Sequence, residues 1–388
     1  MSILTLNAGS SSLKFSVYDR TGETERLRGH LDGVGADATL HVSIRGEAMR
    51  ARDLPGREHG HQGAMKAALD VAADETGETV HAVGHRIVHG GADFDRALVL
   101  DETVMARLRA FTPMAPLHQP HNLDGVEAAR AAFPDALQVG AFDTAFHRGH
   151  PLENDVFALP RRYYEQGVRR YGFHGLSYAY LSERLAELDP GAERAVIAHL
   201  GSGASMCAIR EGRSVGSTMG FSALDGLPMA TRCGQLDPGV MLYLMAEDGL
   251  DAEALTDLLY RESGLRGLSG VSGDMRELEA SAAPEAREAI DYFVFRCRRE
   301  LAAMTAVLGG LDAVVFSGGV GENSALIRER IMAGFEYLDL APDPDANADA
   351  SGDAVRVSAP GARVRAWMIR TDEERIIARD AARCLQEQ

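Results

Sequence analysis

Short apolar runs separated by polar turns characterise the start of the chain. Apolar residues gather at 3–6 and again at 13–18, and the interval between them is rich in Asn, Gly and Ser. The second run ends in DRTGE, residues 19–23, where Asp and Gly supply turn chemistry. This pattern predicts two short strands joined by a Gly/Ser turn, so that the chain begins as a β-meander.

Strand-like and helical stretches then alternate along the chain. HAVGHRIVHGG (81–91) and LQVGAFDTAFH (137–147) have the apolar character of strands, whereas ETVMARLRAF (102–111) is prone to form a helix. Alternation of this kind is typical of α/β proteins. We therefore expect an α/β fold.

A second copy of the opening pattern lies halfway along the chain. AVIAHLGSGASMCAIREGR (195–213) is again a strand, a small-residue turn, a strand and a turn, and an offset of 193 residues superimposes Ser205 on Ser12. That offset is close to half of the 388 residues. The echo predicts two similar α/β halves that can face each other across a cleft.

Three later segments give local predictions. VVFSGGVGENSALIRERI (314–331) predicts a strand and a Gly-rich turn leading into a helix, whose N-terminus is suited to bind phosphate. The acidic, Ala-rich stretch 341–354 predicts a surface loop. Further on, Thr371 and Glu374 have the spacing of a capping box for a final helix.

The net charge limits the partners of the protein. With 40 Lys and Arg against 57 Asp and Glu, the net charge is −17, which repels nucleic acid and anionic membranes, so neither is an expected partner. An anionic ligand must then be received by a few local cations. Just two of the 40 cations are lysines, Lys14 and Lys66, which makes Lys14 a notable choice.

Length and cysteine spacing add three expectations. At 388 residues the chain is long enough for two or three domains. No apolar run approaches the about 20 residues of a membrane span, and the first residues lack the pattern of a secretory leader, so we expect a cytoplasmic protein. The four cysteines lie far apart without CxxC spacing, which argues against a zinc ribbon or a disulfide framework.

The segment NAGSSSLK, Asn7 to Lys14, carries the first candidate chemistry. Backbone N–H groups, hydroxyls and one ammonium in a tight turn can cradle a phosphate. The segment is not a P-loop, because the pattern GxxxxGK[ST] occurs nowhere in the chain. A plain solvated hairpin turn is the alternative interpretation.

The segment GHRIVHGG contains His85, Arg86 and His89. The two histidines have the i, i+4 spacing of metal ligands, but no third ligand stands at a recognisable distance, and packed or surface histidines are the alternative. Arg86 can instead hold a carboxylate or a phosphate with two parallel hydrogen bonds.

Four further residues stand in contexts that suit function. His118 lies between two prolines, His174 follows an aromatic pair in RRYGFHG, and Arg232 precedes a Gly turn. Asp143 ends an apolar strand, where α/β proteins place functional groups. Each of these residues can also be structural. All 13 histidines fall at or before position 199, which disfavours a zinc site in the second half.

Taken in order, these segments resemble the acetokinase family, which comprises acetate, propionate and butyrate kinases. The resemblance extends from residue 3 to residue 380, and it rests on ten motifs: NAGSSSLK, GHRIVHGG, APLHQP, FDTAFH, RRYGFHG, AHLGSGAS, TRCGQLDPG, SGDMR, FSGGVGENS and TDEERIIARD. Ten motifs in one order are far more specific than any one of them.

The resemblance implies a fold, an activity and partners. The fold is the duplicated two-domain α/β fold of actin, sugar kinases and Hsp70, with a central cleft. We expect an N-terminal acyl- and phosphate-binding domain at 1–148, to which 372–388 return, and a nucleotide-binding domain at 149–371. The implied reaction is reversible in-line transfer of the terminal phosphoryl of ATP to a short-chain carboxylate with Mg²⁺, or Mn²⁺ as an alternative ion, giving an acyl phosphate and ADP in a homodimeric enzyme.

The resemblance also implies roles for the candidate residues. Arg86 and Arg232 would grip the carboxylate and the migrating phosphoryl, His174 would donate to its equatorial oxygens, and His118 would assist. Asp143 corresponds to the usual proton acceptor. Because a carboxylate substrate is already ionised, we expect Asp143 to orient an Arg or a metal-bound water instead.

The remaining implied positions bind metal, phosphate and adenosine. Asn7 and Glu373 correspond to the Mg²⁺-linked positions. Ser10, Ser12 and Lys14 would lie near the phosphates of the first domain. The nucleotide positions of the second half are His199, Leu200, Gly201, Ser202, Gly203, Asp274, Met275, Arg276, Gly319, Val320, Gly321, Glu322 and Asn323.

The chain departs from the family pattern near these positions. Ser202 replaces the usual Asn, Gln235 replaces an acid, and Leu176 and Tyr178 stand where a Thr and a His are common. A hydroxyl at 202 offers one donor instead of two, so a phosphate contact can pass to water.

The acyl pocket departs from the pattern as well. Its wall is expected at Val88, Leu117, Phe173 and Ala223, and Ala223 replaces a Pro. Because a methylene contributes about 1–3 kcal/mol to discrimination, we expect propionate to be accepted nearly as well as acetate.

Two other interpretations remain open. The first keeps the fold and changes a substrate, with butyrate as acceptor or pyrophosphate as donor. The second is a non-enzymatic ATP-binding protein of the same fold. Arg86, His174 and Arg232 argue against the second interpretation, because a mere switch would need the nucleotide turns and not these three residues.

Overall fold

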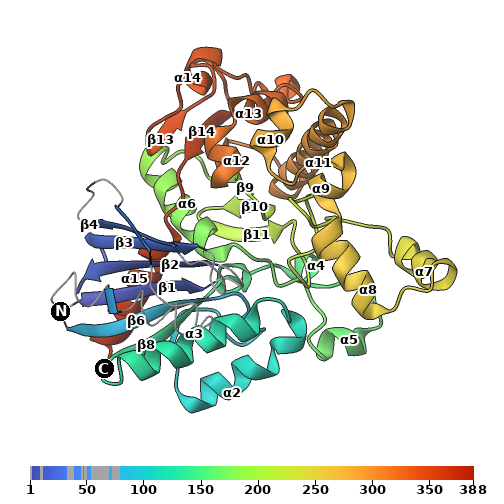
Figure 1. Cartoon of the computed structure of the whole chain (residues 1–388). Coiled ribbons are helices and arrows are strands. Elements are labelled where there is room, and N and C mark those ends of the chain that lie inside the picture. The colour runs from blue at the N-terminus through green and yellow to red at the C-terminus, as the bar shows by residue number, and fades with distance from the viewer. Residues whose placement is uncertain are drawn as a thin grey trace. The chain divides into compact units, whose positions relative to one another are not determined.

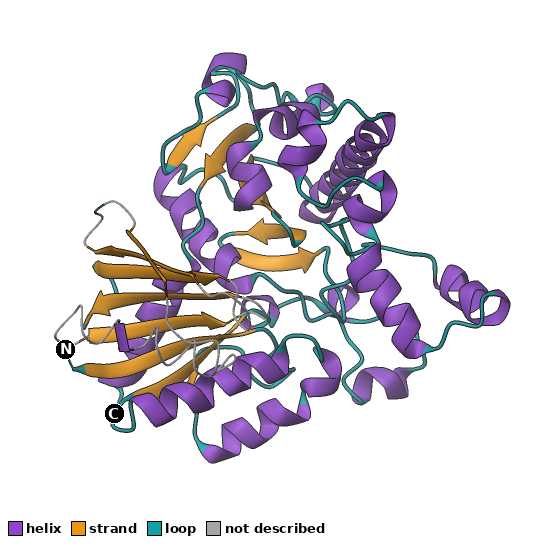
Figure 2. Ribbon diagram, viewed as in Figure 1, coloured by secondary structure: helices purple, strands orange, loops and turns teal. Residues whose placement is uncertain are grey.

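The computed structural model describes residues 2–8, 12–32, 39–44, 47, 50–53, 70–71 and 79–388. The chain forms two compact units, each with its own sheet (Figures 1 and 2). Unit 1 comprises 1–148 and 372–388, and unit 2 comprises 149–371. Within the described ranges, none of the helices combines the length and the apolarity needed to cross a membrane.

Unit 1 is built on an eight-stranded mixed sheet of order β5-β4-β3-β2-β1-β6-β8-β7. Its strands are β1 (Ser2–Ala8), β2 (Ser12–Asp19), β3 (Glu25–Asp32), β4 (Thr39–Ile44), β5 (Arg50–Asp53), β6 (Val80–Ile87), β7 (Leu98–Val99) and β8 (Leu137–Phe142). Its helices are α2 (Glu102–Ala110), α3 (Gln119–Ala132) and α15 (Glu373–Gln386), with short 3₁₀ turns at Thr112–Met114 and Ala145–His147. The predicted opening meander and the predicted helix at 102–111 are confirmed.

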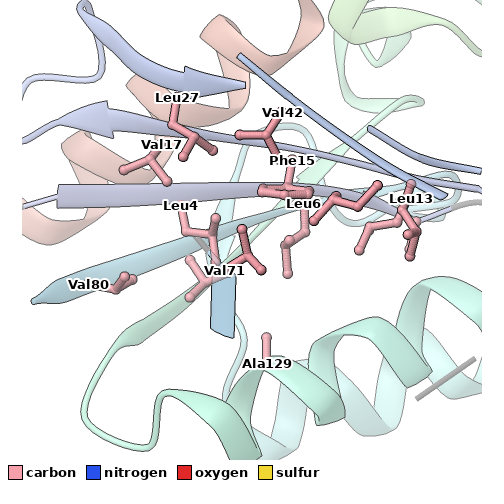
Figure 3. Close-up of a cluster of buried hydrophobic side chains, with 14 of the residues drawn as sticks. Leu4, Leu6, Leu13, Phe15, Val17, Leu27, Val42, Val71, Val80 and Ala129 are labelled. Carbon is pink, nitrogen blue, oxygen red and sulfur yellow. The ribbon is translucent and has the colours of Figure 1, made fainter. Parts of the chain in front are cut away.

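Helices α3 and α15 cover opposite faces of this sheet. Val83 belongs to the apolar cluster that Ala129 of α3 completes, whereas a side chain on the next residue, Gly84, would meet Ile377 and Ala381 of α15. Neighbouring residues of a strand point to opposite faces, so each helix has a face of its own. Figure 3 shows the cluster on the α3 side, where Leu4, Leu6, Phe15 and Val17 of the opening hairpin pack.

Unit 2 is built on a six-stranded mixed sheet of order β11-β10-β9-β12-β14-β13. Its strands are β9 (Arg194–Leu200), β10 (Ala204–Arg210), β11 (Arg213–Ser217), β12 (Ala313–Ser317), β13 (Ala354–Arg356) and β14 (Arg365–Ile369). Its α-helices are α4 (Leu152–Asp155), α5 (Arg161–Glu165), α6 (Gly175–Leu188), α7 (Pro238–Glu247), α8 (Ala252–Asp257), α9 (Gly264–Ser269), α10 (Met275–Ala280), α11 (Pro284–Leu308), α12 (Gly318–Asn323), α13 (Ala325–Met332) and α14 (Pro344–Ala348), with a π-helical turn at Leu258–Glu262 and a 3₁₀ turn at Glu336–Leu338. Every residue of β12 is buried, because helices cover both faces of the central strands.

The two sheets share one arrangement of five strands. The order β3-β2-β1-β6-β8 in unit 1 matches β11-β10-β9-β12-β14 in unit 2, and in each case the first two pairings are antiparallel and the last two parallel. The predicted duplication is therefore confirmed. When the hairpins are aligned on their last pairs, Ala8 with Leu13 and Leu200 with Ala204, Ser205 matches Lys14, whereas the sequence echo aligned it with Ser12.

Two local predictions are wrong. The stretch 341–354 contains α14, which Asp343 caps and which buried Arg328 anchors by donating to the side chain and the carbonyl of Asn347. The final helix begins after Asp372, whose carboxylate accepts the Arg375 N–H, so Thr371 is not its cap. Asp372 stands directly before the helix, and its carboxylate accepts an N–H group of the first turn. Asp372 therefore takes the capping role that was predicted for Thr371.

Candidate active site

In unit 1, Arg86 is the centre of a buried charged cluster. Arg86 lies in β6 and Asp143 follows β8, the neighbouring parallel strand, so both residues stand at the carboxyl edge of the sheet. The Nη2 of Arg86 donates to the Asp143 carboxylate at 2.7 Å, and the Nε donates at 3.1 Å. The Asp143 side chain is 2% exposed, so water competes little with this pairing.

The two predicted metal positions face the same nitrogen of Arg86. The Oδ1 of Asn7 accepts from Nη1 at 3.3 Å, and the Oε2 of Glu373 lies 3.5 Å from that atom. Asn7 lies near the end of β1, which neighbours β6, and Glu373 is the first residue of α15. The fold thereby joins residues that are more than 360 positions apart in the chain.

The electrostatics of this cluster favour a further cation. Burial alone would lower the pKa of Arg86, but the Asp143 and Glu373 carboxylates raise it above its ordinary value. Burial raises the pKa of Asp143, and Arg86 opposes that rise. Burial and the Glu373 charge also raise the pKa of Glu374. The acids outnumber the single guanidinium, and their oxygens are the ligands that Mg²⁺ prefers.

The structure describes the two strands, β1 and β2, that flank the phosphate turn predicted in unit 1. Ser10 lies outside the described residues, and Ser12 is described as the first backbone position of β2. Lys14 lies beside Asn7 in the register and has an exposed side chain, so its ammonium stands at the surface near the Arg86 cluster.

His85 and His89 are packed residues. His85 is buried and its Nε2 bonds the Oε1 of Gln138 at 2.8 Å, while the Nδ1 of His89 accepts the Gly91 N–H at 2.9 Å. Burial lowers the pKa of each histidine to about 4. Across the described part of the chain, no group of three or more His, Cys, Asp or Glu side chains is placed to hold a metal ion.

His118 lies half-buried immediately before α3, next to two amides that the sequence analysis missed. The Nε2 of Gln119 donates to the His89 carbonyl, and the side chain of Asn122 accepts the Val88 N–H at 3.0 Å and donates to the Ala8 carbonyl at 2.9 Å. These amides tie α3 to the ends of β1 and β6. The sequence did contain a signal for these two amides, because the segment HQPHN places both within one helical turn.

In unit 2, His174 has an unusual backbone and a fixed ring. Its φ is +58°, in the left-handed region that side chains other than glycine rarely adopt, and such strain is typical of functional positions. Its Nδ1 bonds the Ser205 hydroxyl at 2.8 Å, and Ser205 in turn bonds the Tyr178 hydroxyl. The contact between Ser205 and His174 was not predicted from the sequence.

His199 stacks on His174 in a parallel arrangement. The ring centroids are 4.4 Å apart, and the Nδ1 of His199 bonds the Ser177 hydroxyl at 2.8 Å. A serine thus holds the Nδ1 of each ring. A side chain on Gly203 would stand 3.3 Å from the Nε2 of His174, and one on Gly201 would stand 3.9 Å from the Nε2 of His199, so both Nε2 atoms face the glycine turn.

Arg232 reaches the same glycine turn. Its Nη1 would stand 4.0 Å from a side chain on Gly203, and it donates to the Ala223 carbonyl at 3.1 Å. Unit 2 therefore brings together His174, Arg232 and the predicted pocket residue Ala223. Gln235 is used elsewhere, because its carbonyl oxygen accepts from Arg296 and Arg299 of α11.

The two glycine-rich turns of unit 2 lie side by side. The position of a side chain on Gly201 is 3.7 Å from the Gly319 N–H group, at the start of α12. Gly318 has a φ of +75° and approaches the Leu200 carbonyl so closely that a side chain would stand 2.7 Å from it. The carboxylate of Glu322 accepts the Gly318 N–H and fixes this turn.

The other nucleotide positions of unit 2 differ in exposure. Ser202 and Arg276 are exposed, Asp274 caps α10 and pairs with Arg276, and the side chain of Met275 is buried. Met275 can therefore offer a ligand its backbone rather than its side chain. The turn at 319–323 presents Gly319, Val320 and Asn323 toward the surface, while Leu200 and Gly321 are buried.

The four predicted pocket-wall residues divide between the units. Val88 and Leu117 belong to unit 1, where both are half-buried, and Leu117 directly precedes His118. Phe173 and Ala223 belong to unit 2, where Phe173 is buried and Ala223 is half-buried.

Fold and site residues together point to a class of enzyme. A duplicated α/β fold, an arginine held by carboxylates in one unit, and histidine, arginine and glycine turns in the other are the features expected of a phosphotransferase. The acetokinase family model matches residues 2–379, and the chain belongs to that family of carboxylate kinases.

Individual relatives agree with the family assignment. The chain is 51% identical to an acetate kinase of Methylocella silvestris, with 97% of this chain and 96% of the relative covered. Among solved structures, acetate kinase of Porphyromonas gingivalis is 35% identical with a TM-score of 0.89, and each chain is covered to 99%. A propionate kinase of Francisella tularensis is 31% identical with a TM-score of 0.91, and the coverage is 98% of this chain and 99% of that one.

Proposed function

We propose that this enzyme transfers the terminal phosphoryl of ATP to acetate, reversibly and with Mg²⁺, giving acetyl phosphate and ADP in the cytoplasm. Propionate is the second acceptor. Mn²⁺ is an alternative metal ion. The family assignment and the acetate kinases among the relatives support the proposal.

One observation carries the proposal beyond the family. At Gly203 a side chain would crowd the Nε2 of His174 at 3.3 Å and stand 4.0 Å from the Nη1 of Arg232, so both donors converge on this glycine. Two convergent donors suit the oxygens of a phosphoryl group in transfer. A non-enzymatic ATP-binding protein would have no use for this arrangement.

The roles of the cations follow from the charge of the reactants. Acetate is ionised before it reacts, so no strong base is required, and the difficulty is to bring two anions together. Arg86 and Arg232 offset the repulsion, His174 donates to the phosphoryl oxygens, and His118 assists. Both carboxylate oxygens of Asp143 accept hydrogen bonds from Arg86, which supports an orienting role rather than that of a proton acceptor.

The residues of unit 1 fit a magnesium ion. Asn7 and Glu373 each place an oxygen close to the Nη1 of Arg86, at 3.3 Å and 3.5 Å. The carboxylates around Arg86 carry more negative charge than its one guanidinium neutralises, so a bound cation would be stabilised there. Mg²⁺ bound there would neutralise the charge of phosphate oxygens.

Unit 2 supplies the nucleotide site in this proposal, and unit 1 the acyl and phosphate site. Gly201 and Gly319 bring two glycine-rich turns together, and the backbone of such turns suits a chain of phosphates. Asp274 and Arg276 are placed at the surface, where they can contact the adenosine end.

Trapping of acyl phosphate with hydroxylamine tests the reaction and the acceptor. We expect product with ATP, Mg²⁺ and either acetate or propionate, with the two kcat/KM values within about tenfold because Ala223 leaves room for one methylene. Butyrate, GTP and pyrophosphate complete the comparison, since Ser202 bears on the choice of donor.

The Ala223→Pro variant is the matched control for the pocket. It should lower kcat/KM for propionate more than for acetate. Absence of product with every acid would contradict the proposed reaction, and a strong wild-type preference for acetate would contradict the wider pocket.

The homodimer forms the last part of the proposal, and helix α7 supports it. Each residue of α7 is exposed except Leu244, which is half-buried, and Leu242 and Tyr243 are 67% and 62% exposed. An apolar helix of this kind gains little by packing within its own chain. It is therefore a candidate for the contact with a second copy.

Light scattering tests the dimer. The wild-type protein should have twice the mass of one 41.7 kDa chain, and the double variant Leu242→Ser/Tyr243→Ser should shift toward the single-chain mass. Tyr337→Ser is the control, because Tyr337 is 70% exposed and lies outside α7. A dimer unaffected by the double variant would place the contact elsewhere.

A further inference from the structure

A hydrogen-bonded chain of three side chains ends at His174. The Tyr178 hydroxyl bonds the Oγ of Ser205, and that Oγ bonds the Nδ1 of His174 at 2.8 Å. Tyr178 lies in α6, one turn after His174, and Ser205 lies in β10, so two elements hold the chain in place. Tyr178 occupies a position where the family pattern commonly has His.

We propose that Tyr178 is a positioning residue whose hydroxyl, acting through Ser205, keeps the proton of neutral His174 on Nε2. The inference rests on the proposed function, since it concerns how His174 donates to the phosphoryl group.

The direction of the hydrogen bonds follows from the strength of the donors. Tyr178 is fully buried, and burial raises the pKa of its phenol well above the ordinary value, so the hydroxyl keeps its hydrogen. A phenol is a stronger donor than an aliphatic alcohol, so Tyr178 donates to Ser205. Ser205 is then free to donate its own hydrogen, and a hydroxyl that accepts one hydrogen bond donates a better second one.

The acceptor of that second hydrogen bond is the Nδ1 of His174. A neutral imidazole has one N–H and one bare nitrogen, so an accepting Nδ1 requires the proton on Nε2. The Nε2 faces Gly203 in the glycine turn, where the proposed function needs a donor to phosphoryl oxygens. The opposite tautomer would present a lone pair there and repel those oxygens.

Nitrogen-15 NMR of histidine-labelled protein measures the tautomer directly, with the His174 signals assigned from their absence in His174→Gln. In the wild-type protein we expect a bare Nδ1 and a protonated Nε2. In Tyr178→Phe the two shifts should move toward each other, and kcat should fall about tenfold with KM for ATP within about twofold.

Three variants separate positioning from general damage. Tyr178→His restores a donor and should recover both the tautomer and kcat. Tyr171→Phe removes another buried hydroxyl of unit 2, which donates to the Gly167 carbonyl, and should change neither. Ser205→Ala interrupts the same chain and tests the inference if Tyr178→Phe does not fold.

The NMR result does not depend on turnover. Unchanged His174 shifts in Tyr178→Phe, or in Ser205→Ala if Tyr178→Phe does not fold, would overturn the inference even if the enzyme makes acyl phosphate. Absence of acyl phosphate from the wild-type protein would instead contradict the proposed function.

Discussion

Replacing Arg86 by alanine is expected to abolish acyl phosphate formation and to lower the free energy of unfolding by about 3–5 kcal/mol. The variant removes the cation that Asp143 holds with both oxygens, and it leaves that carboxylate buried beside Glu373. An uncompensated buried charge is costly, whereas loss of a surface pair costs little. Urea unfolding and the hydroxylamine assay measure the two effects.

Two further variants separate the stability effect from the catalytic effect. Arg86→Met combined with Asp143→Leu removes both partners, so it should recover much of the stability and none of the turnover. Arg194→Ala is the matched control, because Arg194 also contacts an aspartate, Asp312, through two nitrogens but lies outside the site. Normal turnover in Arg86→Ala would show that the cluster is structural alone.

Replacing Arg232 by alanine is expected to lower kcat about 10²–10³-fold while the Kd for ATP changes by less than about twofold. Arg232 stands with the Nε2 of His174 at Gly203, where charge develops on the phosphoryl group, so we expect it to act on the transfer step more than on the binding of ATP. Steady-state kinetics and calorimetric titration with ATP give the two quantities.

Arg266→Ala is the control for this experiment, since Arg266 is an exposed arginine of α9 outside the proposed site. If Arg232→Ala loses ATP binding and turnover together, Arg232 is a nucleotide ligand rather than a residue of the transfer step. If it loses neither, the donor pair at Gly203 does not carry the chemistry.

The layout of the fold could be predicted because local signals repeat. Both opening hairpins consist of apolar runs around a small-residue turn, and both were predicted. The predicted offset of 193 residues between the two hairpins was not exact, because the turns that close them differ in length. β1 and β2 close with the pair Ala8 and Leu13, whereas β9 and β10 close with Leu200 and Ala204. Backbone pairing fixes the cross-strand partners within each hairpin, which the sequence echo did not contain.

The clusters of the site could be predicted only in part. The resemblance supplied Arg86, Asp143 and Glu373 as separate residues, but their meeting depends on strand order and on where α15 returns, which single segments do not encode. The Ser205 contact was missed for a related reason. Serine in a strand carries no signal of its own, and its partner His174 lies 31 residues away on another element.

The wrong predictions arose where a tertiary contact outweighed composition. An acidic, Ala-rich stretch with two prolines is typical of a loop, yet α14 forms within it because Asn347 is buried against Arg328. Arg328 is itself fully buried, and its charge is matched by carbonyl oxygens and an amide. Composition alone cannot indicate such an anchor.

Because α15 returns to unit 1, the two units can complete their folds only in a fixed order during translation. Unit 2 is one continuous segment, so it can complete its fold while the rest of the chain is still being made. The sheet of unit 1 is translated early, but the helix that covers Gly84 follows after the whole of unit 2. A translation product that stops before residue 372 therefore has one bare sheet face and lacks Glu373. We expect such a fragment to be inactive and to expose an apolar surface that chaperones and proteases can recognise.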